Sequence, residues 1–264
     1  EEALEGRPRR APREEEAGRL MRIVSLCPST TESLFALGLG GHLVGVTRYC
    51  VHPREALQGI PRVGGTKNPD LAAIAALEPD LVLCNAEENR EADVAELSRL
   101  HRVELSHPRR VADVPPMLRR LGALTGTGEA AEGLARDVEE RLAAARAARP
   151  VRFAYLVWKG PFMAASAGTY ISDLLATFGG VNVFPAEAGD WPRTDEAAVR
   201  ELAPELLVLP DEPYRFTGAD REQWRGVLPS ARVALVSGED FCWHGVRTLQ
   251  GLAAAERLLW GSGE

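Results

Sequence analysis

The most constraining feature of this sequence is a phrase that occurs twice. Residues 71–83 read LAAIAALEPDLVL, and residues 196–209 read EAAVRELAPELLVL. The separation is much longer than the roughly 20 to 50 residues that solenoid repeats use. In each copy, apolar residues at helical spacing lead to a proline and then to a continuous apolar run, which predicts a helix followed by a buried parallel strand. The repeat therefore predicts two related α/β half-molecules.

The remaining sequence alternates strand and helix patterns in the same way. Ser29 and Glu32 fit a capping box at the start of the first helix, with Ser29 as the N-cap. Apolar runs predict strands at 21–26, 43–47, 81–83, 153–158, 206–209 and 233–238, and helical patterns cover 29–37, 111–124, 171–178 and 248–260. Each half is therefore expected to be a small sheet with its own helices.

One long helix is the candidate connection between the halves. Residues 129–148 are rich in Ala, Glu, Arg and Leu, and Pro150 ends the pattern. The predicted fold class is α/β, with two lobes that hold small, mainly parallel sheets and are joined by one long rigid helix. The expected divisions are a disordered tail over 1–20, an α/β lobe over 21–125, a bridging helix over 126–150 and a second α/β lobe over 151–264.

Composition and charge limit the partners. The net charge of -7 disfavours nucleic acid, which usually binds a basic surface. Residues 1–20 are dense in charge, which is typical of disorder, and they lack the apolar stretch of a secretory signal. As written, the chain is expected in the cytoplasm; a periplasmic or other extracytoplasmic location is the alternative if Glu1 begins a processed form.

Candidate site residues follow the predicted strands, because ligands of open α/β sheets bind at the carboxyl ends of the strands. The aromatic and polar side chains at these exits are Tyr49, His52, Glu88, Trp158, Phe162, Trp191, Trp243 and His244. All four cysteines also lie there, at positions 27, 50, 84 and 242. We expect these side chains to converge between the lobes.

Four stretches carry a resemblance to a known family: RIVSLCPSTTESLFALGLG, VGVTRYCVHP, VGGTKNPDLAAIAALEPDLVL, and FGGVNVF followed by WP. The chain resembles the helical-backbone periplasmic binding proteins of ABC importers for cobalamin and iron-siderophores, most closely the cobalamin-binding branch. The resemblance implies a small-molecule ligand between the lobes, namely cobalamin, another tetrapyrrole or an iron chelate, and no required cofactor. It assigns contact with a flat corrin to Tyr49, Phe162, Trp191 and Trp243, with His52 and His244 as polar or axial partners.

The same resemblance bears on the transporter. Family members dock onto an ABC permease through one exposed glutamate on each lobe, placed in the two copies of the repeated phrase. Ala72 and Ala197 stand at these positions. This departure suggests a soluble relative that kept the ligand cleft and lost the permease.

Two alternatives stay open. Cys50 and His52 could bind a metal, since thiolate and imidazole suit zinc or copper(I); the chain would then be a cytoplasmic thiol- or metal-binding relative. A buried cysteine, however, also packs as a small hydrophobe, and Glu88 could simply favour a helix start. Ser166, within Ala-Ala-Ser-Ala-Gly, faintly resembles the nucleophile of a serine hydrolase, with His244 as its base. We expect a binding protein and not an enzyme.

Overall fold

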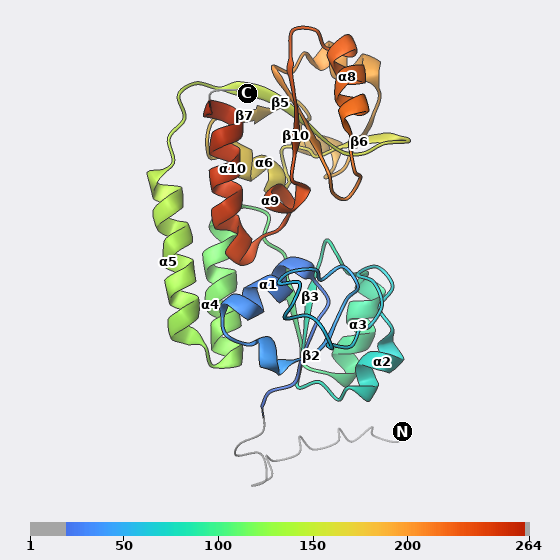
Figure 1. Ribbon diagram of the computed structural model, residues 1–264, viewed down its shortest axis with the longest axis vertical. Coiled ribbons are helices and arrows are strands. Elements are labelled where there is room, and N and C mark those ends of the chain that lie inside the picture. The colour runs from blue at the N-terminus through green and yellow to red at the C-terminus, as the bar shows by residue number, and fades with distance from the viewer. Residues whose placement is uncertain (1–19, 262–264) are drawn as a thin grey trace, which may run out of the picture.

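The computed structural model describes residues 20–261, which form two lobes stacked along the long axis of the molecule (Figure 1). Except for Leu20, the expected tail over 1–20 lies outside the described residues. In the described part of the chain, no helix combines the length and the apolar character needed to cross a membrane. The two expected α/β lobes are both present.

The first lobe contains a four-stranded sheet whose strands are all parallel, in the order β2-β1-β3-β4. Strand β3 is buried at every position, as its continuous apolar run predicts. The elements are β1 (Ile23–Ser25), α1 (Pro28–Ala36), β2 (Leu43–Val46), α2 (Leu71–Ala76), β3 (Leu81–Asn85), α3 (Glu91–Leu100) and β4 (Val103–Ser106).

The second lobe contains a six-stranded, mainly parallel sheet in the order β10-β9-β5-β6-β8, with β7 also paired to β5. Only the β5–β6 and β6–β8 pairs are antiparallel. The strands are β5 (Val151–Trp158), β6 (Phe162–Ala164), β7 (Gly180–Asn182), β8 (Arg193–Thr194), β9 (Leu206–Pro210) and β10 (Arg232–Val236). The helices are α6 (Tyr170–Ala176), α7 (Glu196–Leu202), α8 (Gly218–Val227), α9 (Gly238–Cys242) and α10 (Thr248–Trp260).

The lobes are connected by α5 (Gly128–Ala144), beside which α4 (Val114–Thr125) runs in the opposite direction (Figure 1). Helix α5 ends four residues before the expected residue 148. Ala131 packs in the core of the first lobe, whereas Ala135 and Val138 pack in the core of the second. The bridging helix therefore belongs to both cores, and α4 packs against it (Figure 1).

The repeated phrase has the same local geometry in both lobes. The carboxylates of Asp70 and Asp195 cap α2 and α7 by accepting the main-chain N–H three residues later, at 2.9 and 2.8 Å. Glu78 and Ala203, each directly before the proline, adopt left-handed backbone conformations with φ of 44° and 46°. A left-handed residue is uncommon outside glycine, so its recurrence at the same point confirms that the two phrases are structural equivalents.

The predicted capping box in the first helix is wrong. Helix α1 begins at Pro28, with Cys27 as the N-cap and no side-chain capping bond. Proline is favoured at the first helical position because its missing N–H would have no partner there. Ser29 therefore lies inside the helix, and Glu32 is free to bind Arg247 of the second lobe.

Candidate functional site

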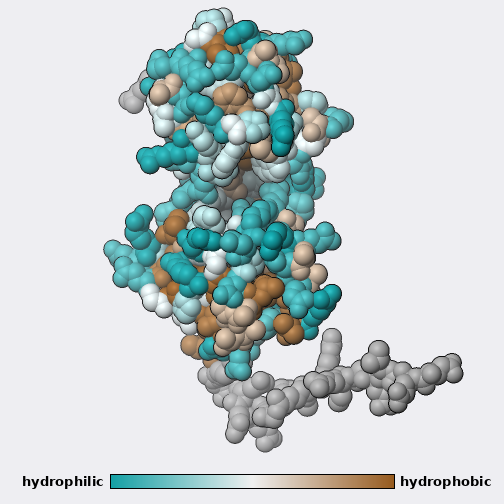
Figure 2. All heavy atoms as spheres, turned by 90° about the vertical axis from the view of Figure 1, so that its right-hand side faces the viewer, coloured by the Kyte–Doolittle hydropathy of each residue, from teal (hydrophilic) through white to brown (hydrophobic). Residues whose placement is uncertain are grey.

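A cavity of about 330 Å³ lies between the lobes, with side chains from both of them in its lining. Figure 2 shows the hollow between the lobes, which is rimmed mostly by hydrophilic side chains. Glu87 and Glu88 enter the lining from the loop after β3, and Glu212 enters from the loop after β9. The equivalent strands of the two repeats therefore deliver carboxylates to opposite sides of one cavity.

The apolar part of the lining includes three aromatic side chains, those of Tyr170, Trp191 and Trp243. Trp243 is 5% exposed, its Nε1 donates to Oε1 of Glu212 at 3.2 Å, and the Arg247 guanidinium lies 5.1 Å from its ring centre. Trp191 is 37% exposed, so part of its ring is available to a ligand. Trp191 therefore offers a planar ligand an apolar contact, and Trp243 forms a buried wall beside it.

The carboxylate loop of the first lobe is held by amide side chains. Oδ1 of Asn85 accepts the main-chain N–H groups of Glu87 and Glu88, at 2.9 and 3.2 Å. Burial raises the pKa of Glu87, and it also raises the pKa of Glu212; the nearby charge of Glu88 adds to both shifts. Lys67 lines the same cavity and donates to the main-chain oxygen of Glu87.

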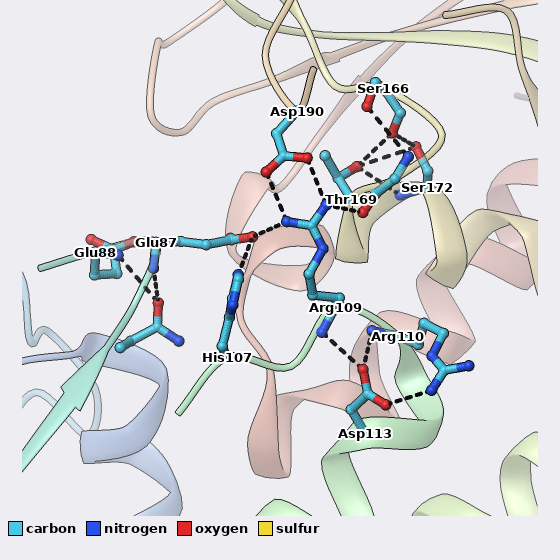
Figure 3. A network of polar contacts seen from close by, with 12 residues as sticks. Glu87, Glu88, His107, Arg109, Arg110, Asp113, Ser166, Thr169, Ser172 and Asp190 are labelled. Atoms are coloured by element: carbon cyan, nitrogen blue, oxygen red, sulfur yellow. Dashed lines mark hydrogen bonds and ion pairs between the residues drawn. The ribbon is translucent and has the colours of Figure 1, made fainter. Parts of the chain in front are cut away.

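A polar network joins the lobes beside the cavity (Figure 3). Arg109 follows β4 in the first lobe and donates two hydrogen bonds to Asp190 in the second, at 2.7 and 2.6 Å. Its Nη2 also donates to the main-chain oxygen of Gly168. Oε1 of Glu87 lies 3.9 Å from Arg109 and 3.6 Å from His107. The network therefore connects a cavity carboxylate to the loop that carries Trp191.

A second junction between the lobes follows Trp243. Arg247 donates two hydrogen bonds to Glu32, both at 2.7 Å, and the two side chains are only 11% and 17% exposed. The main-chain N–H of Val246 donates to Oγ of Ser33 at 3.2 Å. Gly245 has φ +83°, and a Cβ there would lie 2.1 Å from that hydroxyl. Glycine is therefore required by both the backbone conformation and the close approach.

His244 is buried at this junction. Nδ2 of Asn85 donates to its Nε2 at 3.1 Å, and Oγ of Ser29 lies 3.3 Å from the same atom. Burial lowers the pKa of His244 to about 4, so the ring is neutral at physiological pH. It is a structural contact between the lobes and is not part of the cavity lining.

Four of the residues predicted from sequence line the cavity: Glu88, Trp191, Cys242 and Trp243. His52 lies behind the lining, with its ring 5.7 Å from that of Trp243 and its Nε2 2.9 Å from Glu239. Its position supports Trp243 and does not reach the cavity.

The other predicted aromatic residues have different surroundings. Phe162 packs edge-on against Trp224, with ring centres 5.2 Å apart. Trp158 is 42% exposed and contacts Tyr214 at 5.7 Å, and Tyr49 is 53% exposed. Tyr49 follows β2 as predicted, whereas Trp158 ends β5 and Phe162 begins β6; none of the three contributes to the cavity lining.

The proposed Cys50–His52 metal site gains no support. The Cys50 thiol is 1% exposed and lies 3.1 and 3.2 Å from the hydroxyls of Thr31 and Thr47, whereas His52 faces Glu239. Among residues 20–261, no group of three or more His, Cys, Asp and Glu side chains is placed to hold a metal ion. Cys50 is best described as a core residue, as buried cysteines often are.

The hydrolase alternative is not favoured either. Ser166 is completely buried, and its hydroxyl accepts the main-chain N–H of Gly168 at 3.3 Å. His244, its expected base, contacts Ser29 and Asn85 instead. A nucleophile and its base must lie within hydrogen-bond reach, and this pair has separate partners.

Several residues of the site were missed from the sequence. They are Lys67, Glu87, Tyr170 and Glu212 in the lining, and Arg109 and Asp190 in the network beside it. Glu212 could have been found, because it closely follows the second apolar strand of the repeat, a strand exit that is the counterpart of the one before Glu88. Arg109 carries no such signal, since its importance depends on a partner in the other lobe.

Comparison with known proteins places this geometry in context. The sequence profile of the family described as "Periplasmic binding protein" matches residues 23–220. The vitamin B12-binding protein of Vibrio cholerae is 26% identical over 209 residues, covering 77% of this chain and 74% of that protein. The vitamin B12-binding protein of Pectobacterium carotovorum is 26% identical over 235 residues, covering 86% and 84%.

Solved structures have the same fold. The periplasmic vitamin B12-binding protein BtuF of Vibrio cholerae superposes with a TM-score of 0.78 at 24% identity, covering 90% of this chain and 96% of that chain. A periplasmic haem-binding protein from Pseudomonas aeruginosa superposes with a TM-score of 0.77 at 23% identity, covering 92% and 94%. The two-lobed α/β architecture is thus shared by proteins with different ligands.

Proposed function

Because the chain belongs to the periplasmic binding protein family, we propose that it binds a corrin of the cobalamin type between its lobes. The observation that carries the proposal is the cavity at the strand exits of both sheets, with Trp191 and Trp243 in its lining. Such crevices are the usual ligand sites of open α/β sheets. The vitamin B12-binding relatives extend over most of this chain, which supports the same ligand class here.

The size of the cavity constrains how the ligand sits. A volume of about 330 Å³ lies at the lower end of the roughly 300 to 1,000 Å³ of small-molecule sites. We therefore place one edge of the corrin in the cavity, between Trp191 and Trp243. The remainder would lie against other strand exits, where Tyr49 and Trp158 are exposed.

The lining favours a corrin over haem. Haem iron is held by a protein side chain, most often histidine, cysteine, methionine or tyrosine. Within the described residues the lining contains no histidine or methionine, and the Tyr170 hydroxyl is hydrogen-bonded to Thr248 at 2.8 Å. Burial raises the pKa of the Cys242 thiol well above its usual range, which disfavours the thiolate. Cobalamin carries its own axial ligands and needs none from the protein.

The family also supports an extracytoplasmic protein that delivers its ligand to an ABC permease, over the cytoplasmic location that the sequence favoured. Ala72 on α2 and Ala197 on α7 are both exposed. Docking would then depend on shape or on neighbouring groups and not on a pair of glutamates. The proposed role requires binding and release only, without catalysis.

Titration calorimetry of the metal-free protein with cyanocobalamin, haem and zinc, each separately, tests the proposal. We expect cyanocobalamin to bind, and Trp191→Ala and Trp243→Ala each to weaken it by about 2 kcal/mol, or about 30-fold. If Trp243→Ala does not fold, Trp243→Phe takes its place in the test, because phenylalanine keeps most of the packing. Trp260→Phe, whose indole donates to the main-chain oxygen of Phe178 away from the cavity, is the matched control. Unchanged affinity in the cavity variants, or binding of haem or zinc alone, contradicts the proposal.

A further inference from the structure

We propose that the cavity selects its ligand by charge. It accepts a corrin whose edge carries amides or a positive charge, and it rejects a tetrapyrrole whose edge carries carboxylates. Glu88 and Glu212 are the residues that set this preference. The inference rests on the proposed function and goes beyond it, because the fold is shared by proteins for both kinds of ligand.

The charges that line the cavity are unbalanced. Three carboxylates, from Glu87, Glu88 and Glu212, face one ammonium group, that of Lys67. The carboxylates come from both lobes, so a ligand between the lobes meets negative charge on both sides. The chain as a whole is also negative, with a net charge of -7. A carboxylate on the ligand would therefore be repelled at close range.

The two arginine side chains near the cavity are already paired with acidic side chains of the protein. Arg109 binds both oxygens of Asp190. Arg247 binds Glu32 and also lies 3.5 Å from Glu239 and 3.3 Å from Asp240. A ligand carboxylate could recruit either guanidinium only by displacing one of these acids.

The cavity carboxylates retain capacity to accept hydrogen bonds. Oε1 of Glu87 is the exception, because it is buried and lies 3.6 Å from His107 and 3.9 Å from Arg109. The Glu88 carboxylate has no hydrogen bond or ion pair to any other residue between 20 and 261. Glu212 accepts one, from Trp243. Amide N–H groups of a ligand would satisfy these oxygens, and an unsatisfied buried acceptor is costly. The cavity thus favours a ligand that donates hydrogen bonds.

Two corrins with the same ring test the inference. Cobinamide carries amide side chains, whereas cobyrinic acid carries carboxylates in their place. We expect the protein to bind cobinamide at least tenfold more tightly at pH 7.5 in low salt, and the difference to shrink in 1 M NaCl because salt screens the repulsion. Calorimetry or tryptophan fluorescence gives both affinities.

Glu88→Gln and Glu212→Gln, singly and together, should raise the affinity for cobyrinic acid and reduce the discrimination. Glu96→Gln, on the exposed face of α3 and paired with Arg99, is the control and should leave both affinities unchanged. Equal affinities in the unmodified protein, or discrimination that survives the double substitution, overturns charge selection while the proposed function stands. If cobinamide, cobyrinic acid and cobalamin all fail to bind, the proposed function itself is refuted.

Discussion

Arg109 and Asp190 join the two lobes through a pair of parallel hydrogen bonds of 2.7 and 2.6 Å, directly before the tryptophan that lines the cavity (Figure 3). This geometry makes Arg109 a positioning residue for Trp191. The main-chain oxygen of Asp190 also accepts the N–H of Ser166, which ties the loop to its own lobe. The position of the ring in the cavity therefore depends on both lobes.

We predict that Asp190→Asn weakens cobalamin binding about fivefold, or about 1 kcal/mol. The amide removes the charge and one of the two acceptor atoms, so the Trp191 loop is held less firmly. Calorimetry checks the affinity and urea unfolding checks the fold. Arg110→Gln, which breaks the exposed Arg110–Asp113 pair inside the first lobe, should have no effect on affinity. Equal losses in the two variants would refute the positioning role.

The pair of Glu32 and Arg247 should contribute more to stability, because both side chains are largely buried. In Glu32→Gln the buried positive charge of Arg247 loses the carboxylate of Glu32. We expect this change to lower the free energy of unfolding by about 3 kcal/mol. Urea denaturation measures the change. Glu104→Gln, which breaks the exposed bidentate pair with Arg120, is the matched control and should cost less than about 1 kcal/mol. Similar costs for the two would show that the junction between the lobes adds little.

His244 should make stability depend on pH. Burial lowers its pKa from 6.5 to about 4, so between these values the unfolded state binds a proton that the folded state does not. Stability is therefore complete above about pH 6.5 and falls on acidification, by at most about 1.4 kcal/mol per pH unit. His244→Gln should flatten the profile between pH 4 and 6.5. An identical slope in the His244 variant and the unmodified protein would exclude this residue as the source.

The four thiols should react in a definite order. Cys242 is partly exposed and lines the cavity, whereas Cys27, Cys50 and Cys84 are buried. Burial raises the pKa of all four thiols, Cys242 included, so every site should react slowly and exposure should set the order. Iodoacetamide should therefore label Cys242 first, slowly, and saturating cobalamin should protect it. Mass spectrometry of digests follows each site; labelling that cobalamin leaves unaltered would place the ligand elsewhere.

The fold was accessible from sequence where patterns are local. The repeated phrase predicted the helix and buried strand at 71–83 and 196–209, and the final helix was predicted at 248–260, where α10 lies. Strands β4, β6, β7 and β8 were missed, because they are two to four residues long and too short for a periodic pattern. The start of α1 was misread because a serine followed by a glutamate three residues later is only a local signal.

The site was predicted less completely, for a physical reason. The rule that side chains after strands gather at one edge correctly found Trp191, Trp243 and Glu88. It cannot tell which exits point into the cavity, so it also selected Phe162, which packs against Trp224. Contacts such as that of Arg109 with Asp190 depend on the relative placement of the lobes, which no local pattern encodes.

The length of the bridging helix α5 sets the separation of the two lobes. Helix α5 has 17 residues, which corresponds to about 26 Å of rise, and its two ends are packed into different cores. The number of residues in α5 thus determines how far apart the two sides of the cleft lie. One added helical turn would lift the second lobe by about 5.4 Å and keep the buried face of α5 against α4, whereas half a turn would rotate that face toward solvent. An insertion into α5 is therefore expected to preserve both packed faces only when it comes close to a whole number of turns.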